Sequence, residues 1–149
     1  MLASTVLWSI VGRNISRVVA RYAETDQMGI IHHSVYPVWF EAARTEYIKT
    51  AGITYTQLEK MGVMLPLSEL GCKYMMPVHY EDEVTIVTET VRLSVSRVTF
   101  RYRVVLEGKI MAEGTTTHAF VSTETFRPIN LKKVMPELYE KLRESVVEE

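Results

Sequence analysis

The sequence of 149 residues has little cysteine and almost no excess of charge of either sign. Cys72 is the only cysteine, which excludes an internal disulfide and a metal site built from several thiolates. Lys and Arg total 17 against 18 Asp and Glu, so the net charge of −1 gives no overall attraction to nucleic acid or to an anionic membrane. The histidines show no HExxH or similar ligand spacing. We therefore expect no metal, no nucleic-acid partner and a cytoplasmic location.

The sequence also lacks an apolar run long enough to cross a membrane. Residues 1–12 are apolar, but a membrane-spanning helix needs about 20 residues. The same stretch has no basic leader and no clear small-residue cleavage site, so it does not resemble a secretory signal. We expect residues 1–14 to form an N-terminal arm or an extra strand. The chain has about the length of one domain, and we expect residues 1–149 to form a single one.

A long apolar helix is predicted between Ser34 and Gly52. Six side chains share one face of a 3.6-residue period: Tyr36, Trp39, Phe40, Ala43, Tyr47 and Ile48. Four further apolar residues widen this stripe: Val35, Val38, Ala42 and Ala51. Such a wide stripe predicts a helix that is buried around most of its circumference. Ser34 can cap its start, Pro37 is tolerated in the first turn, and Gly52 can end it.

The remaining pattern predicts an antiparallel sheet. Runs rich in Val, Ile and Thr, or alternating between apolar and polar residues, predict strands over 15–22, 65–76, 83–94, 97–106 and 110–122. In the second of these, Gly71 indicates a bulge or bend. Helical spacing predicts a short helix over 54–61 and a terminal helix over 130–147, where Pro136 is a potential break. One long helix against strands joined by short turns predicts a two-layer α+β domain.

The loop before the long helix carries the residues best suited to chemistry. Asp26 and His33 lie in it, and Gly29 between them permits backbone angles, or a close ligand approach, that a side chain would block. The first N–H groups of a helix have no intrahelical acceptor and carry a partial positive charge, so the backbone near His33 is a ready donor to a developing oxyanion. The plainer alternatives are that Asp26 is an ordinary turn residue and that His33 makes only local hydrogen bonds.

The segment from Tyr22 to Arg44 resembles the signature of a known family. Its pattern is Tyr-x-x-Thr-Asp-x-x-Gly-x-x-x-His-x-x-Tyr-x-x-x-Phe-Glu-x-Ala-Arg. This pattern is similar to that of the hotdog-fold acyl-CoA thioesterases of the 4-hydroxybenzoyl-CoA thioesterase superfamily, in particular the YbgC-like branch. The resemblance implies a sheet of five or more strands curled around the central helix. It also implies dimers that join their sheets, or dimers of dimers, with active sites at the subunit interface.

The same resemblance implies roles for individual residues. Asp26 matches the family's catalytic carboxylate, acting as nucleophile or as general base on a water, and His33 matches the histidine seven positions later. The N–H groups at the helix start, chiefly that of His33, would polarise the thioester carbonyl of an acyl-CoA substrate. No cofactor is implied, because coenzyme A is part of the substrate. Acyl chain length, and coenzyme A against acyl carrier protein as the carrier, stay open.

Other candidate residues have a structural alternative beside the functional one. Tyr36, Phe40 and the run 74–76 could line an acyl pocket, although aromatic and Met residues at such positions are more often core. Arg97, Arg101 and Arg103 share one face of a strand, which is a solvated surface or, alternatively, a site for the phosphates of coenzyme A. Glu41 and Arg44 are spaced for a surface ion pair, the alternative being that Glu41 acts as an acid near the substrate.

Two other functions are compatible with the fold class. A hotdog hydratase or dehydratase acts on hydroxyacyl thioesters, but the His-Phe-Pro-Gly type of motif expected there is absent. A non-catalytic acyl-CoA-binding sensor would need an output module, and about fourteen residues before the first predicted strand cannot hold a helix-turn-helix domain. The sequence therefore favours an acyl-CoA thioesterase.

Overall fold

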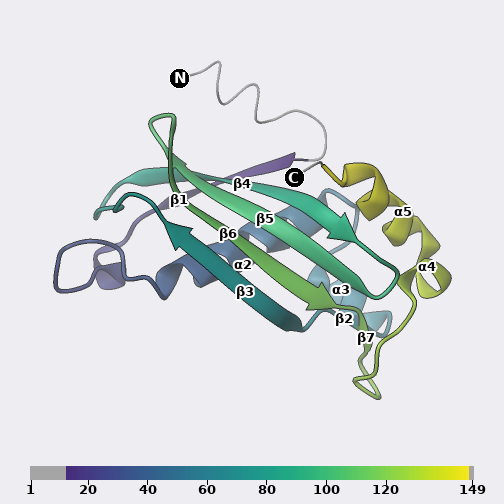
Figure 1. The fold of residues 1–149 in the computed structure, drawn as a ribbon. Coiled ribbons are helices and arrows are strands. Elements are labelled where there is room, and N and C mark those ends of the chain that lie inside the picture. The colour runs from purple at the N-terminus through teal and green to yellow at the C-terminus, as the bar shows by residue number, and fades with distance from the viewer. Residues whose placement is uncertain (1–12, 148–149) are drawn as a thin grey trace.

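Five antiparallel strands form the main sheet, in the spatial order β1-β4-β5-β6-β3 (Figure 1). The computed structural model describes residues 13–147, so residues 1–12 of the arm or extra strand predicted over 1–14 lie outside them, while residues 13 and 14 begin β1. The strands of this sheet are β1 (Arg13–Val19), β3 (Leu67–Tyr74), β4 (Glu83–Leu93), β5 (Arg97–Leu106) and β6 (Lys109–Ala119). A second, two-stranded sheet pairs β2 (Val63–Met64) with β7 (Val121–Ser122). The α+β architecture agrees with the sequence pattern.

The long helix α2 (Val35–Lys49) packs across one face of the sheet (Figure 1). Its buried side chains are the six that the periodicity placed on one face: Tyr36, Trp39, Phe40, Ala43, Tyr47 and Ile48. The expectation of burial around most of the helix is wrong, because Val38 is 59% exposed and Ala42 is also exposed. Only one layer of sheet packs on α2 within the described residues, so its opposite side has nothing to cover it.

The helices that follow α2 in the chain lie toward one end of the sheet (Figure 1). The short helix α3 (Tyr55–Lys60) begins with a reciprocal capping box between Thr54 and Gln57. The C-terminal stretch forms α4 (Leu131–Val134) and α5 (Pro136–Ser145), which are divided where the sequence places its helix-breaking proline. No helix in residues 13–147 is long and apolar enough to cross a membrane.

Two strand predictions need correction. The first strand ends at Val19 and is followed by the short 3₁₀ helix η1 (Tyr22–Glu24), because the Glu24 carboxylate accepts a hydrogen bond from the Arg21 N–H (2.8 Å) and closes a turn there. The irregularity in β3 lies between Leu67 and Glu69 rather than at Gly71. Gly71 pairs in register with Thr115, because its backbone does not take a positive φ.

Helix and sheet meet most closely at Phe40. Its ring is fully buried and stacks on Tyr102, with ring centroids 4.5 Å apart and planes within 9°. Gly114 on β6 makes this approach possible, since a Cβ added there would lie 2.4 Å from Phe40 Cε2 and 2.9 Å from the carbonyl oxygen of Gly71. The contact fixes the height of α2 above the sheet, and with it the position of the loop that enters the helix.

Candidate active site

The loop from Glu24 to Ser34 is anchored to α2 through a buried carboxylate. Glu24 Oε2 accepts a hydrogen bond from the indole Nε1 of Trp39 (3.1 Å), and Oε1 accepts one from the Arg21 N–H (2.8 Å). Burial raises the pKa of the Glu24 carboxyl, but the hydrogen bonds from Arg21 and Trp39 outweigh it and hold the pKa below its ordinary value. Glu24 is therefore a carboxylate that ties the loop to the helix.

Asp26 organises the turn in which it lies. Its N–H donates to the Ile30 carbonyl (2.8 Å), and its own carbonyl accepts from the N–H of Gly29 (3.0 Å). The carboxylate Oδ1 accepts from the N–H of Met28 (2.8 Å) and, more distantly, from that of Ile30 (3.4 Å). The second oxygen, Oδ2, accepts no hydrogen bond from residues 13–147. One oxygen therefore holds the turn, and the other remains available to a substrate or water.

The N–H of His33, at the start of α2, is an open backbone donor. The Val35 N–H donates to the His32 carbonyl (3.0 Å), and the Ser34 N–H donates to Nδ1 of the His32 ring (3.1 Å). The His33 N–H, by contrast, has no acceptor in the part of the chain that the structure describes. Ser34 lies at the N-cap position, but its side chain does not cap the helix as expected, because its Oγ lies 2.8 Å from His32 Nδ1 instead.

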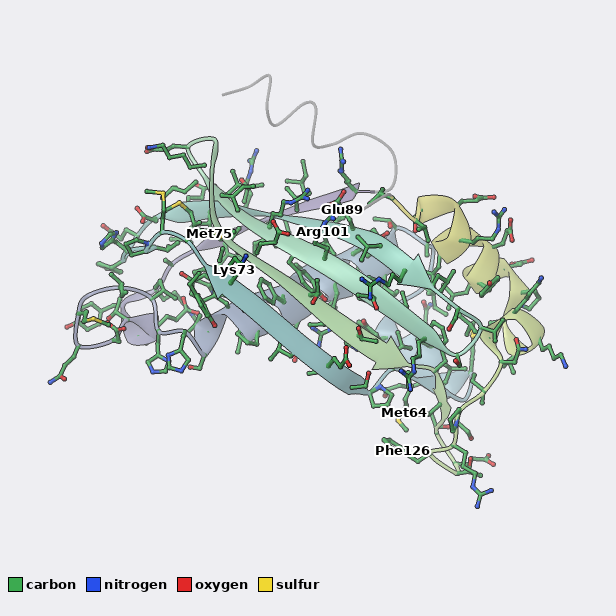
Figure 2. The ribbon with its side chains drawn as sticks, viewed as in Figure 1. Met64, Lys73, Met75, Glu89, Arg101 and Phe126 are labelled. Carbon is green, nitrogen blue, oxygen red and sulfur yellow. The ribbon has the colours of Figure 1, made fainter. Side chains whose placement is uncertain are left out.

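Asp26 and His33 line the same open pocket, which has a volume of about 350 Å³. The Tyr74 hydroxyl donates to the His33 carbonyl (2.8 Å), and its ring packs edge-on against Tyr36 with centroids 5.0 Å apart. The rest of the wall is apolar and is made by Met28, Ile30, Ile31, Met75, Met76 and Pro77. Figure 2 shows Met75 just beyond β3, at the end of the sheet where this loop lies. The pocket therefore has a polar end and an apolar wall, as a site for an acyl thioester requires.

Known proteins resemble the chain along most of its length. The family model described as "Thioesterase superfamily" matches residues 28–113, more than half of the chain, and begins two residues after Asp26. The Bacillus subtilis protein named "Putative acyl-CoA thioesterase YneP" is 35% identical over 130 residues, which cover 85% of this chain and 94% of that protein. The chain belongs to the thioesterase superfamily. It is thus a thioester hydrolase, as the sequence pattern predicts.

Solved structures of similar proteins support the same assignment. A DHNA-CoA thioesterase from Staphylococcus aureus is 34% identical, with a TM-score of 0.84 over 88% of this chain and 89% of its own. A hypothetical protein from Thermus thermophilus is 38% identical, with a TM-score of 0.81 over 91% of this chain and 99% of its own. These similarities confirm that this member of the thioesterase superfamily has the predicted hotdog fold.

Gly29 and Phe40 do not line this pocket. Gly29 has a φ of +79°, a backbone angle that favours glycine, and a Cβ added there would meet no atom of the described residues within 4 Å. A close approach of substrate to Gly29 stays a prediction. Phe40 is fully buried against Tyr102 and does not line the pocket. Tyr36 does line it, beside Tyr74 and the two methionines that follow.

Arg97 and Arg101, for which phosphate binding was the alternative to a solvated surface, lie away from this pocket. Arg97 pairs with Ala119, beside the start of β3, whereas the pocket lies beyond its end, roughly 23 Å away at 3.3 Å per residue. Arg101 is only 8% exposed and donates twice to Glu89 Oε1, at 3.0 and 3.2 Å. Figure 2 shows the side chains of Arg101 and Glu89 beside each other on the sheet. The solvated surface predicted for Arg101 is wrong, because a cross-strand ion pair buries it.

Glu89 is the centre of that ion-pair group. Its carboxylate is fully buried and also contacts Arg13 Nε (2.6 Å) and Arg103 Nη1 (3.1 Å). Burial raises the pKa of Glu89, but the hydrogen bonds from Arg13 and Arg101 outweigh it and keep the pKa below its ordinary value. On α2, Arg44 Nη2 lies 3.9 Å from Glu41 Oε2, which is the ion pair predicted from their spacing.

Sequence reasoning missed several residues of the site. Met28 and Ile30 line the pocket, and His32, which the sequence analysis did not single out, organises the start of the helix. The signal for His32 was its position two residues before Ser34, because the side chain of a capping residue can accept the backbone N–H two residues ahead. No group of three or more His, Cys, Asp or Glu that could hold a metal occurs among the described residues.

Proposed function

We propose that this thioesterase hydrolyses an acyl-CoA thioester in the pocket between Asp26 and the start of α2. The observation that carries the proposal is that a carboxylate oxygen and a backbone N–H, both without partners in the described residues, line or adjoin one pocket. The names of the Bacillus subtilis and Staphylococcus aureus relatives support coenzyme A as the carrier. The single free cysteine, Cys72, is compatible with the cytoplasmic location that the sequence predicts.

In this proposal the His33 N–H donates to the thioester carbonyl oxygen and stabilises the negative charge that develops there. Asp26 Oδ2 either attacks the carbonyl carbon, which forms a mixed anhydride and releases the coenzyme A thiolate, or takes a proton from a water that attacks instead. In the first route water then hydrolyses the anhydride. A thiolate is a good leaving group, so one carboxylate and one oriented donor suffice, the donor alone contributing on the order of 10²–10³ in rate.

The acyl group in this proposal is small or medium in size. A pocket volume of about 350 Å³ lies near the lower end of the range for small-molecule sites, which runs from about 300 to 1,000 Å³. Tyr36, Tyr74 and the methionines provide an apolar wall that suits an aromatic or a short aliphatic chain. The imidazole of His33 is exposed at the pocket, where it can orient the attacking water or the thioester.

We also propose that two copies of the chain pair through β3. This strand is an edge of the sheet, and most of its residues are exposed, including the apolar Leu67, Leu70 and Tyr74. An open, apolar edge strand is a template for pairing with a second strand. A two-fold axis across β3 brings the start of one strand against the end of the other. The partner's Met64 and Phe126 region, at the far end of the sheet in Figure 2, would then approach the Asp26 pocket.

The experiment is hydrolysis of acetyl-, hexanoyl-, palmitoyl- and benzoyl-CoA by the purified protein, followed with a thiol-detecting reagent. We expect thiol release from the smaller acyl groups, and we expect Asp26→Asn to lower kcat by at least about 10³-fold, since it removes both routes for Asp26. The matched control is Asp82→Asn, whose carboxylate accepts from the His79 N–H (2.8 Å), lies 3.9 Å from His79 Nδ1 and does not line the pocket. Undiminished turnover in Asp26→Asn would refute the assignment of Asp26, and binding without turnover in the wild type would refute hydrolysis.

A further inference from the structure

We propose that His32 is a positioning residue for this reaction, which caps the first turn of α2 and fixes the His33 N–H in the direction of the pocket. The inference rests on the proposed function, because that is where the His33 N–H becomes the oxyanion donor. His32 lies outside the set of residues that line the pocket, so it acts through the backbone of its neighbour.

Four hydrogen-bonding contacts hold His32 and the turn that follows it. Its N–H donates to the Glu24 carbonyl (2.8 Å), and its carbonyl accepts from the Val35 N–H (3.0 Å). Nδ1 of its ring accepts from the Ser34 N–H (3.1 Å) and lies 2.8 Å from Ser34 Oγ. A side-chain acceptor for the N–H two residues ahead is the role of an N-cap, so His32 serves in place of Ser34.

The hydrogen-bond pattern also fixes the state of the imidazole. A backbone N–H can only donate, so the Nδ1 that faces Ser34 is an unprotonated acceptor and the ring carries its proton on Nε2. With this acceptor engaged twice, Nδ1 is not available to transfer a proton to or from a substrate. The chemistry of His32 is therefore to accept hydrogen bonds, which separates it from the role proposed for His33.

The cap selects which donor faces the pocket. Ser34 and Val35 both direct their N–H groups to His32, so His33 is the one of these three consecutive residues whose N–H is left for a substrate. The ring of His33 lies over that of His32, with centroids 4.1 Å apart and planes at 30°, which ties the two side chains together. If the cap is removed, the Ser34 N–H is released and the peptide before His33 can rotate. A misplacement of about 1 Å can cost on the order of 10² in rate.

The test compares His32→Ala with His32→Asn. In asparagine, Oδ1 is bonded to Cγ just as Nδ1 is in histidine, so the acceptor is kept but the imidazole is lost. We expect His32→Ala to lower kcat by about 10- to 100-fold with KM changed less than about threefold, and His32→Asn to recover kcat to within about threefold of the wild type. The substrate is whichever of acetyl-, hexanoyl- and benzoyl-CoA the wild type hydrolyses fastest. The hydrogen-exchange rate of the Ser34 amide should rise in His32→Ala and should return to the wild-type rate in His32→Asn.

The outcomes separate this inference from the proposed function. A kcat of His32→Ala equal to that of the wild type would overturn the inference about His32. A kcat of His32→Asn as low as that of His32→Ala would also overturn it, because the imidazole would then act in some way other than as a cap. Unchanged Ser34 exchange in His32→Ala would also overturn it. If Asp26→Asn keeps full activity, the proposed function fails, and Ser34 exchange still reports whether His32 caps the helix.

Discussion

At the scale of single residues, Asp26 and His33 each use one polar group to hold the fold and leave another polar group open. Asp26 gives Oδ1 to the N–H groups of Met28 and Ile30 and keeps Oδ2 free of the described residues. His33 gives its carbonyl to Tyr74 and keeps its N–H open. Both plainer alternatives from the sequence, a turn aspartate and a locally bonded histidine, are therefore compatible with a catalytic role, because the polar group that holds the fold is not the one left open.

The open N–H of His33 can be removed without removing the turn. Position 33 is the second residue of the turn that the Val35 N–H closes onto the His32 carbonyl, a turn position that favours proline. We expect His33→Pro to have a kcat about 10²-fold lower than His33→Ala, because both lose the imidazole and only proline loses the donor. Steady-state kinetics of the two variants measure this. Equal kcat values, in variants of equal thermal stability, would show that the His33 N–H does not contribute.

At the scale of elements, the sequence predicted most where a pattern is local. The six buried residues of α2 follow from spacing alone, and so does the loop that places Asp26 and His33 before the helix. Arg101 was misjudged because its partner Glu89 comes from another strand, and one strand's alternation does not show what lies opposite it. The prediction that Val38 is buried was also wrong, because an apolar residue does not reveal whether a second layer exists to cover it.

Gly114 offers a test of how α2 seats on the sheet. We expect Gly114→Ala to lower the free energy of unfolding by about 2 kcal/mol, because its methyl group would overlap the buried Phe40 ring and approach the Gly71 carbonyl. Gly71→Ala, on the neighbouring strand, is the control: its Cβ would lie 3.6 Å from Thr115 Oγ1, an ordinary contact, and the change should stay within about 0.5 kcal/mol. Urea unfolding of both variants compares them, and an equal loss in the two would contradict the close-contact explanation.

At the scale of the whole molecule, the edge strand β3 exposes apolar side chains that nothing in a single chain covers within the described residues. We expect the wild type to have about twice the 17.1 kDa mass of one chain by light scattering. Leu70→Lys should give a mass near that of one chain, with reduced thiol release, because a charge on an edge strand opposes pairing. Val134→Lys, on the distant helix α4, is the matched control and should keep the wild-type mass. A wild type that is monomeric at assay concentration would rule out pairing through β3.

Acid should destabilise the fold through His118, a buried residue of β6 whose ring contacts the Leu65 segment. Its Nδ1–H donates to the Leu65 carbonyl (3.1 Å), and Nε2 accepts from Thr116 Oγ1 (2.9 Å). Burial, with the nearby charge of Arg44, lowers the pKa of His118 from 6.5 to about 4. As the pH falls, the unfolded chain takes up this proton near pH 6.5 and the folded chain only near pH 4. The stabilisation present above pH 6.5 is therefore lost between these values.

The size of that loss is bounded by the difference between the two pKa values, no more than roughly 3 kcal/mol. We expect the free energy of unfolding of the wild type to fall between pH 6.5 and 4 more steeply than that of His118→Gln, which has no titrating group there. Denaturant unfolding at several pH values measures both slopes. Parallel slopes in the two proteins would show that His118 is not the group responsible.

The central claim is that Asp26 and the His33 N–H meet at the thioester carbonyl. A crystal structure of Asp26→Asn with an intact acyl-CoA bound tests it most directly. The account predicts the carbonyl oxygen about 2.7–3.1 Å from His33 N, with the side chain of residue 26 facing the carbonyl carbon or a water beside it. A thioester bound with its carbonyl away from the start of α2, beyond reach of residue 26, would contradict it.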